Sequence, residues 1–316
     1  MKAIILQQTG GTENLILTNI NKPTLQPDEV LVNVKAISIN PVDTYVRQHE
    51  QSLAGIVKPR PGEAVILGWD ISGTITETGS AVTAFKKGDD VFGMVNFTGH
   101  GKAYAEYVAA PASQLALKPA NISHEEAAAA TLAALTAWQA LVPYAKIQKG
   151  DKVLIHAAAG GVGHYAVQIA KHLGAYVIGT ASAANRQFVL DLGADEFIDY
   201  TIEKPEEKIT DADIVIDSVF GDHLLRSLDA VKPGGRVISL LTFFEGAIAE
   251  KAKAKNVYAH RLIVTSNGDD MKQLAALLEK GILRSHVAAT YDFADLPKAH
   301  QQVETRRTRG KVVVRV

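Results

Sequence analysis

Hydrophobic and polar residues follow two different patterns along the chain, and the change falls near residue 122. Before it, short apolar runs such as EVLVNVKAISI and DVFGMV are separated by turn segments such as KPTLQPDE and KKGDD. Short apolar runs bounded by proline, glycine and charged residues are typical of strands and turns. The pattern therefore predicts a β-rich, barrel-like domain over residues 1–122.

After residue 122 the pattern becomes helical and then alternates between strands and helices. Ser123 and Glu126 have the spacing of a capping box in front of an alanine-rich helix that ends near Tyr144. The alternation that follows indicates a doubly wound parallel sheet, with helices on both of its faces. The predicted strands are Lys152–Ala157, Tyr176–Thr180, Glu196–Asp199, Asp213–Asp217, Arg236–Leu240 and Arg261–Val264.

From residue 266 the chain returns to a mixed pattern. A helix is predicted in MKQLAALLEKG, a strand in VAATYDF, a short helix at Leu296–Thr305 and a closing strand in GKVVVRV. We expect this segment to pack with the first domain. The predicted fold is therefore α/β, with a β-rich domain from residues 1–122 and 266–316 and a parallel-sheet domain from residues 123–265.

Composition narrows the classes of function. The chain has 316 residues, of which 47% are hydrophobic and 21% charged, and it has no cysteine. The lack of cysteine excludes disulfides, thiol nucleophiles, iron–sulfur clusters and cysteine-ligated zinc. A net charge of −1 offers no attraction to nucleic acid or to an anionic membrane, and the first apolar run is too short for a signal peptide. We expect a cytoplasmic protein that binds small molecules, with no nucleic acid and no membrane as partner.

The segment VLIHAAAGGVGHYAVQIAKHLGAYVIGTAS contains the clearest functional motif. A predicted strand delivers Ala158, Gly160 and Gly163 in the spacing A-x-G-x-x-G, and a predicted helix, Val162–Leu173, follows. Small residues at these positions allow a tight turn, close approach of a pyrophosphate to the backbone, and close packing of the helix on the strand. The second domain is therefore predicted to be a Rossmann domain that binds a dinucleotide at the helix N-terminus.

The end of the second strand indicates which dinucleotide binds. No aspartate or glutamate occurs from His164 to Leu190, where NAD-binding folds place an acid for the adenosine ribose. Ser182, Asn185 and Arg186 stand there instead. A guanidinium and a hydroxyl bind a 2′-phosphate through charge-assisted hydrogen bonds, whereas a carboxylate would repel it. The sequence predicts NADPH as the cofactor; the other interpretation is that Arg186 is a solvated helix residue.

Longer stretches of the chain resemble the zinc-free quinone oxidoreductases of the medium-chain dehydrogenase/reductase superfamily, the group that includes zeta-crystallin. The matching stretches are INPVDTYVR, GWDISGTITETG, GDDVFGM, AYAEYV, IHAAAGGVGHYAVQIAKHLGA, LGADEFIDY, DIVIDSV, KPGGRVISL and RGKVVVRV. The resemblance implies a GroES-like catalytic domain built from both chain ends and a central Rossmann domain. It also implies NADPH in the cleft between them, and a homodimer.

The resemblance also implies roles for individual residues. Asn40 and Tyr45, on a predicted loop after the strand Val30–Ile39, are the catalytic candidates and would orient the acceptor. Asn40 with Pro41 is also a turn former, Tyr45 also suits packing at a domain edge, and Asp43 suits the cap of a local helical turn. The positions implied for the cofactor are Gly160, Gly161, Val162, Gly163, Thr180, Ser182, Arg186 and Tyr200 on the adenosine and phosphate side, Thr136, Ser218, Leu240 and Leu241 on the nicotinamide side, and Lys311 near the closing strand.

No metal site is predicted. The zinc dehydrogenases of the superfamily place a cysteine in the segment matching 38–43 and a histidine–glutamate pair in the segment matching 68–70, where this chain reads SINPVD and GWD. Alcohol oxidation needs help in forming an alkoxide, whereas a quinone or an α,β-unsaturated carbonyl is already electrophilic. The expected activity is NADPH-dependent reduction of such an acceptor. The alternatives are a non-catalytic NADPH-binding protein, crystallin-like or RNA-binding, and a methyltransferase.

Overall fold

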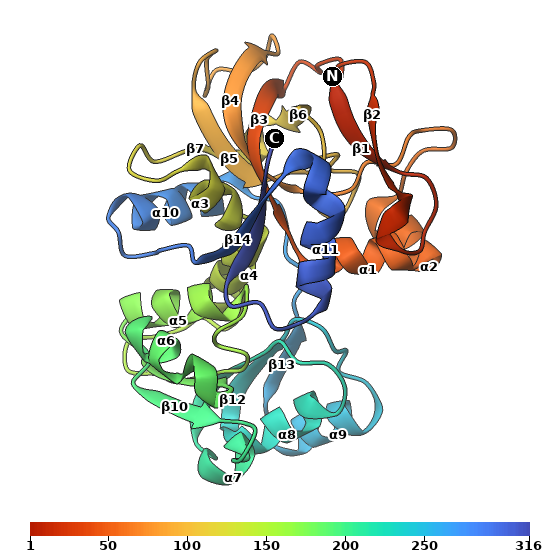
Figure 1. Ribbon diagram of the computed structural model, residues 1–316. Helices are drawn as coiled ribbons and strands as arrows, with labels where there is room; N and C mark the ends of the chain where they lie inside the picture. The colour runs from red at the N-terminus through yellow and green to blue at the C-terminus, as the bar shows by residue number, and fades with distance from the viewer. The chain divides into compact units, whose positions relative to one another are not determined.

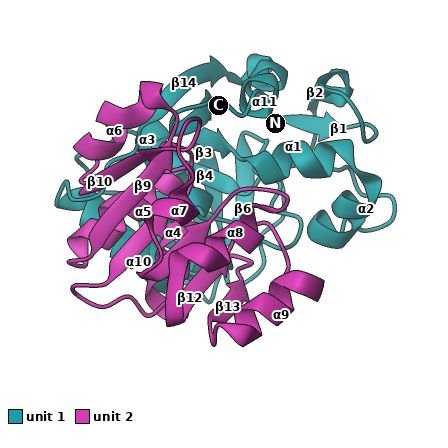
Figure 2. Cartoon of the chain, turned by 90° about the horizontal axis from the view of Figure 1, so that it is seen from below, with its two compact units in different colours: residues 1–135, 265–316 teal, residues 136–264 magenta.

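Both ends of the chain contribute to one structural unit, and the middle of the chain forms a second. In the computed structural model, which describes residues 1–316, unit 1 comprises Met1–Leu135 and Thr265–Val316, and unit 2 comprises Thr136–Val264 (Figure 2). The division falls within helix α4 (Leu132–Gln139), further along the chain than the change of pattern at residue 122.

Unit 1 is built on a seven-stranded sheet with the order β14-β15-β3-β4-β5-β7, to which β6 adds by pairing with β3 (Figure 1). The strand from the end of the chain, β15, runs antiparallel to β3 and parallel to β14. A separate hairpin joins β1 to β2. The strands are β1 Lys2–Leu6, β2 Leu15–Asn19, β3 Glu29–Ile39, β4 Asp70–Thr78, β5 Asp90–Met94, β6 Tyr107–Pro111, β7 Leu115–Leu117, β14 Val287–Asp292 and β15 Lys311–Arg315.

The helices of unit 1 include α3, which the capping box starts as predicted. Glu126 N donates to Ser123 Oγ at 3.1 Å, and Ser123 N donates to a Glu126 carboxylate oxygen at 2.8 Å. Ala128 and Ala129 of α3 share a buried cluster with Ala36 and Val313, so the segment after residue 122 packs on the sheet of unit 1. The helices are α1 Pro41–Gln48, α2 Glu50–Ser52, α3 His124–Ala129, α10 Gly268–Glu279 and α11 Leu296–Glu304, with shorter turns at Thr12–Asn14, Leu53–Val57, Ala112–Gln114 and Phe293–Asp295.

Unit 2 contains a six-stranded parallel sheet in the order β10-β9-β8-β11-β12-β13. The core includes Leu154 of β8, Ile178 of β9 and Val215 of β11, together with Leu224 and Leu228 of α8. The strands are β8 Lys152–Ile155, β9 Tyr176–Ala181, β10 Glu196–Asp199, β11 Ala212–Asp217, β12 Val231–Ser239 and β13 Tyr258–Arg261. The helices are α5 Gly163–His172, α6 Arg186–Asp191, α7 Pro205–Lys208, α8 His223–Ala230 and α9 Gly246–Ala254, with turns at Ala140–Tyr144 and Ala183–Asn185.

The α/β class and the parallel sheet are confirmed, and one strand is displaced from its prediction. The last strand of the sheet is Tyr258–Arg261, whereas the sequence favoured Arg261–Val264. Leu262 and Val264 lie after the end of the strand. Their side chains are apolar and buried, so the sequence pattern there resembles that of a strand. No helix of the structure combines the length and apolar character that crossing a bilayer requires.

Candidate functional site

The glycine-rich turn connects β8 to α5 at the carboxyl end of β8. Gly160 N donates to Ala157 O at 2.8 Å and closes the turn. A Cβ atom at Gly163 would lie 2.2 Å from Ala157 O and 2.8 Å from Ala158 Cα, so only glycine fits between helix and strand there. A Cβ atom at Gly160 would meet its nearest neighbour, Ala157 O, at 3.2 Å. Gly163 therefore serves packing, whereas a Cβ atom at Gly160 would make a close but less severe contact with the backbone.

The residues after β9 include the predicted phosphate ligands. Arg186 begins α6 and is exposed, with its guanidinium carbon 5.3 Å from the centre of the Phe197 ring. Ser182 Oγ accepts a hydrogen bond from Asn185 Nδ2 at 3.1 Å. Tyr200, directly after β10, is 56% exposed. Arg186 and Tyr200 are thus accessible to a ligand.

Thr180 has a different environment from the other predicted phosphate-side residues. It is buried, and its hydroxyl lies 3.2 Å from His156 Nδ1. The Thr180 hydroxyl therefore contacts a buried histidine at the end of β8, a contact that the sequence did not suggest.

An acid does lie beside the end of β9, on the neighbouring strand. Asp199 of β10 stands opposite Ala181 in the sheet register. One of its carboxylate oxygens accepts hydrogen bonds from Thr201 N at 3.0 Å and from Thr201 Oγ1 at 2.7 Å. Asp199 thus closes its own turn. Asp199 lies beside Ala181 only because β10 pairs with β9, so the sequence of β9 alone could not predict an acid at this position.

Three of the four predicted nicotinamide-side residues follow β11 and β12, and the fourth, Thr136, lies on α4. Ser218 Oγ donates to His156 O at 3.1 Å, and Leu240 N donates to Asp217 O at 2.8 Å. Leu241 is half-buried, and the Thr136 side chain is buried. The carboxyl ends of parallel strands meet at one edge of a sheet, so the turn after β8, Ser218 and Leu240 lie along the same edge.

The catalytic candidate Asn40 of unit 1 is buried within a charged network. Its Nδ2 donates to Asp70 Oδ2 at 2.7 Å, and its Oδ1 accepts from the Lys311 ammonium, which also donates to Ile39 O at 3.2 Å. The predicted loop at this point is instead helix α1, because Asn40 and Asp43 form a capping box with Pro41 in the first turn. Both ends of the Asn40 amide are therefore engaged inside unit 1.

Two buried carboxylates share this network. Asp43 Oδ2 accepts from Asn40 N at 2.6 Å, and Asp70 Oδ1 accepts from Leu132 N at 3.0 Å. Burial, with the charge of Asp70, raises the pKa of Asp43 to about 7. Burial also raises the pKa of Asp70 and lowers that of Lys311, while the attraction between their opposite charges acts against both shifts. Near neutral pH Asp43 is partly protonated, which limits the unpaired negative charge inside the unit.

The other catalytic candidate, Tyr45, lies on the exposed side of α1. Its side chain is 48% exposed, and its ring centre lies 4.4 Å from that of His49. On the buried side of the same helix, Arg47 forms an ion pair with Glu304 of α11. The ion pair of Arg47 thus anchors the buried side of α1, and Tyr45 is exposed on the other side.

The side chains at 38–43 and 68–70 do not fit a zinc ion. These segments contain no cysteine or histidine, and tetrahedral zinc sites are built mainly from those residues. Trp69 donates its indole hydrogen to Gly99 O at 2.8 Å, and both oxygens of Asp70 accept hydrogen bonds inside unit 1. The Lys311 ammonium already supplies the local cation. We therefore derive no chemistry from zinc at this position.

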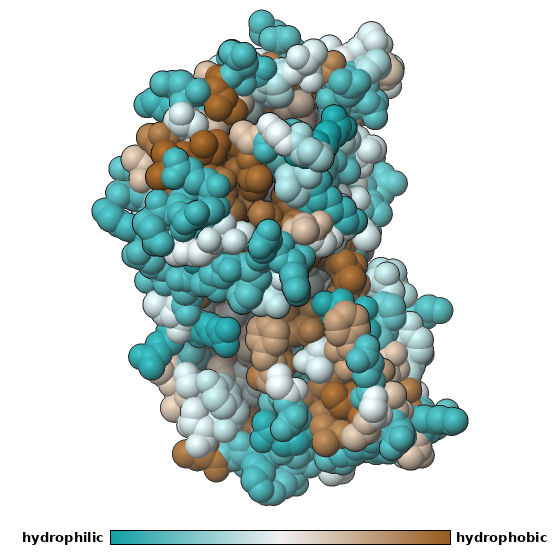
Figure 3. Space-filling view, turned by 90° about the vertical axis from the view of Figure 1, so that its right-hand side faces the viewer, coloured by the Kyte–Doolittle hydropathy of each residue, from teal (hydrophilic) through white to brown (hydrophobic).

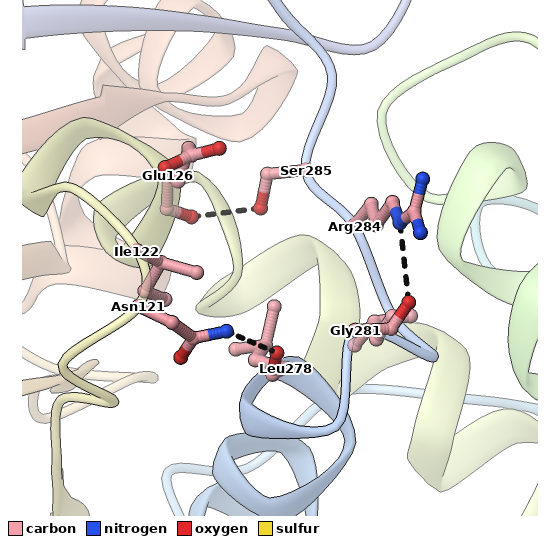
Figure 4. A pocket seen from close by; sticks show the side chains of 8 residues that line it. Asn121, Ile122, Glu126, Leu278, Gly281, Arg284 and Ser285 are labelled. Atoms are coloured by element: carbon pink, nitrogen blue, oxygen red, sulfur yellow. Dashed lines mark hydrogen bonds between the residues drawn. The ribbon is translucent and has the colours of Figure 1, made fainter.

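A separate hollow of about 280 Å³ lies in unit 1 (Figure 4). Ser285 Oγ donates to Glu126 O at 2.7 Å, and Asn121 Nδ2 donates to Leu278 O at 3.2 Å. The hollow is lined by Asn121, Ile122, Glu126, Leu278, Gly281, Leu283, Arg284 and Ser285. None of the predicted site residues is among them.

Comparison with known proteins identifies the family. Two family models match: an alcohol dehydrogenase GroES-like domain over residues 26–120 and a zinc-binding dehydrogenase over residues 192–314. The NADPH-dependent alkenal/one oxidoreductase of Arabidopsis thaliana is 35% identical, over 99% of this chain and 79% of the relative. The structure of the quinone oxidoreductase from Coxiella burnetii matches with a TM-score of 0.92 and 38% identity, over 100% of this chain and 99% of that one. The chain belongs to the quinone oxidoreductase group of the medium-chain dehydrogenase/reductase superfamily.

Membership of the quinone oxidoreductase group agrees with the architecture of both units and confirms the family predicted from the motifs. The Escherichia coli quinone oxidoreductase, solved in complex with NADPH, matches with a TM-score of 0.87 and 30% identity, and both chains are covered completely. The model described as a zinc-binding dehydrogenase matches residues 192–314, which include neither 38–43 nor 68–70. That match therefore adds no ligand to those two segments.

The residues of unit 2 fit the NADPH with which the Escherichia coli quinone oxidoreductase was solved. Gly163 allows the close approach of α5 to β8, and the backbone of Gly160, Gly161 and Val162 forms the turn at the start of that helix. Arg186 places a cation beyond the end of β9, where the strand itself carries no acid. The arrangement suits a pyrophosphate at the turn and an additional phosphate near Arg186.

Proposed function

We propose that this chain is an NADPH-dependent oxidoreductase that reduces a quinone or an α,β-unsaturated carbonyl without zinc. The observation that carries the proposal is the glycine turn after β8 together with the exposed Arg186 after β9, where the chain has no acid. Relatives over the full chain are named for reactions of these two acceptor classes, an alkenal/one oxidoreductase and a quinone oxidoreductase. When bound, NADPH supplies the hydride that reduces the acceptor.

The cofactor ligands that we propose lie along the carboxyl edge of the sheet of unit 2. Gly160, Gly161 and Val162 bind the pyrophosphate through backbone N–H groups, and Gly163 allows the helix to approach. Arg186 and Ser182 bind the 2′-phosphate, which a guanidinium and a hydroxyl hold by charge-assisted bonds. The further residues that we propose for cofactor binding are Thr136, Tyr200, Ser218, Leu240 and Leu241 as contacts, with Thr180 and Lys311 as supporting residues. Because Thr180 and Lys311 are buried, they support the site through His156 and Asn40.

The residues of unit 1 position the acceptor in this proposal. The exposed Tyr45 hydroxyl orients the acceptor by a hydrogen bond to its oxygen. Asn40, with its amide engaged by Asp70 and Lys311, fixes the start of the helix that carries Tyr45. An activated acceptor needs orientation and exclusion of competing water more than it needs acid–base help, so positioned hydrogen-bond donors suffice.

The finer parts of the proposal concern assembly and location. We propose a homodimer, because β13 is an edge strand of unit 2 and exposed apolar side chains lie on or near it. These are Phe243, Tyr258 and Ile263. An unpaired edge with apolar side chains favours pairing with another chain. Apolar patches also lie among polar side chains on the face shown in Figure 3. The cytoplasmic location stays a prediction, and sedimentation analysis would test the dimer.

Initial rates with NADPH and with NADH, against a panel of quinones, enones and alkenals, test the proposal. We expect turnover with at least one class of acceptor and a preference for NADPH. Tight NADPH binding without turnover of any acceptor would instead support the non-catalytic alternative. Turnover of simple alcohols with NADP⁺, lost on removal of a metal, would contradict the zinc-free mechanism.

A further inference from the structure

The strand order of unit 2 reverses between β8 and β11, and histidine and aspartate side chains gather at that point. His156 directly follows β8, Asp217 ends β11, and His223 begins α8. Potential ligand atoms of these three side chains all lie within 4.8 Å of one another. His156 is far from Asp217 and His223 in the sequence, so no motif spacing revealed the cluster.

A fourth polar atom completes the cluster. Ser227 Oγ, one turn further along α8, donates to Asp217 Oδ2 at 2.6 Å. It lies 3.2 Å from His156 Nε2 and 3.4 Å from His223 Nδ1. His223 Nδ1 in turn lies 2.9 Å from Asp217 Oδ2. Four donor and acceptor atoms from two strand ends and one helix therefore face a common centre.

These separations are close to those of a tetrahedral metal site. Zinc bonds to nitrogen and oxygen of about 2.0–2.1 Å place neighbouring ligand atoms about 3.3 Å apart. Four separations can be compared with that value: the three that Ser227 Oγ makes and the one between His223 and Asp217. Each differs from it by less than about 1 Å. The two remaining pairs, which His156 makes with Asp217 and His223, lie within 4.8 Å and would contract on binding.

Outer hydrogen bonds orient two of the four side chains. His156 Nδ1 lies 3.2 Å from Thr180 Oγ1, which leaves Nε2 directed at the cluster. The second oxygen of Asp217, Oδ1, accepts from Val219 N at 2.9 Å. Metal-binding histidines and carboxylates are usually held by such partners on the atom that does not bind the metal.

We propose that His156, Asp217, His223 and Ser227 bind one divalent transition-metal ion, with Zn²⁺ as the best match to two imidazoles, a carboxylate and a hydroxyl. The site lies wholly in unit 2 and is distinct from the segments at 38–43 and 68–70. The His223 side chain is 14% exposed and Asp217 is fully buried, so the ion enters past His223. The ion would tie both ends of the segment 218–222 to β8, and that segment carries Ser218.

Metal titration of chelator-stripped protein without an affinity tag tests the proposal. We expect isothermal titration with Zn²⁺ to give about one ion per chain, and Co²⁺ to give the intense visible absorption of tetrahedral coordination. His223→Ala should weaken Zn²⁺ binding by about tenfold or more, and Ser227→Ala should weaken it less. His172→Ala, which removes an exposed histidine of α5, is the matched control and should bind as the parent does.

Two outcomes overturn the proposal: no Zn²⁺ binding in the parent protein, or equal Zn²⁺ affinity in the parent and His223→Ala. Either would make the cluster a hydrogen-bond network only. His156 and Asp217 are buried and their replacement can unfold unit 2, so the test relies on the half-buried His223 and on circular dichroism of each variant. The titration needs neither NADPH nor an acceptor. Its failure therefore leaves the proposed oxidoreductase function untouched.

Discussion

Arg186 is the single side chain on which the proposed choice of cofactor depends most. It is exposed at the start of α6, and the strand before it has no acid. Arg186→Ala should weaken NADPH binding by about tenfold or more, because a charge-assisted hydrogen bond contributes about 1.5–3 kcal/mol. NADH binding should stay nearly unchanged. Dissociation constants for both cofactors measure the effect, with the exposed neighbour Gln187→Ala as control; equal losses for both cofactors would contradict it.

Two glycines of the same turn should respond differently to substitution. Gly160→Val puts a branched side chain where the pyrophosphate would meet the backbone, so NADPH binding should be lost. Its Cβ would lie 3.2 Å from Ala157 O, so thermal stability should fall modestly. Gly163→Ala forces a Cβ to within 2.2 Å of Ala157 O, so this variant should lose much more stability. A cofactor titration and a thermal melt on both variants separate the effects. Normal NADPH binding by the Gly160→Val variant would show that the turn is not the dinucleotide site.

Asp43 should make the stability of unit 1 depend on pH. Its pKa rises from an ordinary 3.8 to about 7 in the folded protein, chiefly through burial. The folded state therefore holds the proton of Asp43 more strongly than the unfolded state does. The stabilisation that this proton gives is lost as the pH rises from about 4 to 7. Asp43→Asn should gain stability relative to the parent across that range. Chemical denaturation at several pH values measures the difference, and a constant difference would show that Asp43 does not titrate there.

Side-chain environments were the part of the site that the sequence could not predict. The residue types after β8 and β9 were visible in the sequence, because glycine spacing and the absence of an acid are local features. Burial of Asn40 between Asp70 and Lys311 depends on three distant segments. The turn after β8 also puts its left-handed conformation on Ala157, with φ of 49°, although glycine is the residue that ordinarily adopts it.

At the scale of elements, the buried parallel strands were the easiest to predict, because each is a short apolar run between turns. Errors arose where local pattern and tertiary packing disagree. Buried residues after β13 have the apolar pattern of a strand, and the sequence predicts a loop at the capped helix α1 because Asn40 with Pro41 also favours a turn.

The capping box of α3 offers a test of one element. Ser123→Ala removes the oxygen that accepts from Glu126 N, so an orphan N–H remains at the start of the helix. We expect the free energy of unfolding to fall by about 1 kcal/mol, the usual effect of losing such a cap. Denaturation by urea measures it, and Ser123→Asp should restore most of the loss. An unchanged midpoint in Ser123→Ala would mean that packing alone sets where α3 begins.

At the scale of the whole molecule, the main prediction is activity without a metal. Asn40, Asp43 and Asp70 occupy the segments of unit 1 that match the zinc ligands of related dehydrogenases, and they share one hydrogen-bonded network with Lys311 of β15. Reductase activity should therefore survive dialysis against a chelator that strips every ion, including any in unit 2. Rates and metal content of the same sample are compared. Loss of activity, restored by Zn²⁺, would contradict the zinc-free mechanism.

Strand β15 reaches the ribosome exit after every other strand of its sheet, yet it lies between β14 and β3 and brings Lys311 to Asn40. The strands of unit 2 are complete by Arg261. Domains tend to fold as units while the chain is synthesised. Unit 2 can therefore fold while translation continues, whereas the strands of unit 1 made first must wait for the last. During that interval β3 lacks one partner, and chaperones that bind exposed apolar strands would act on the N-terminal half.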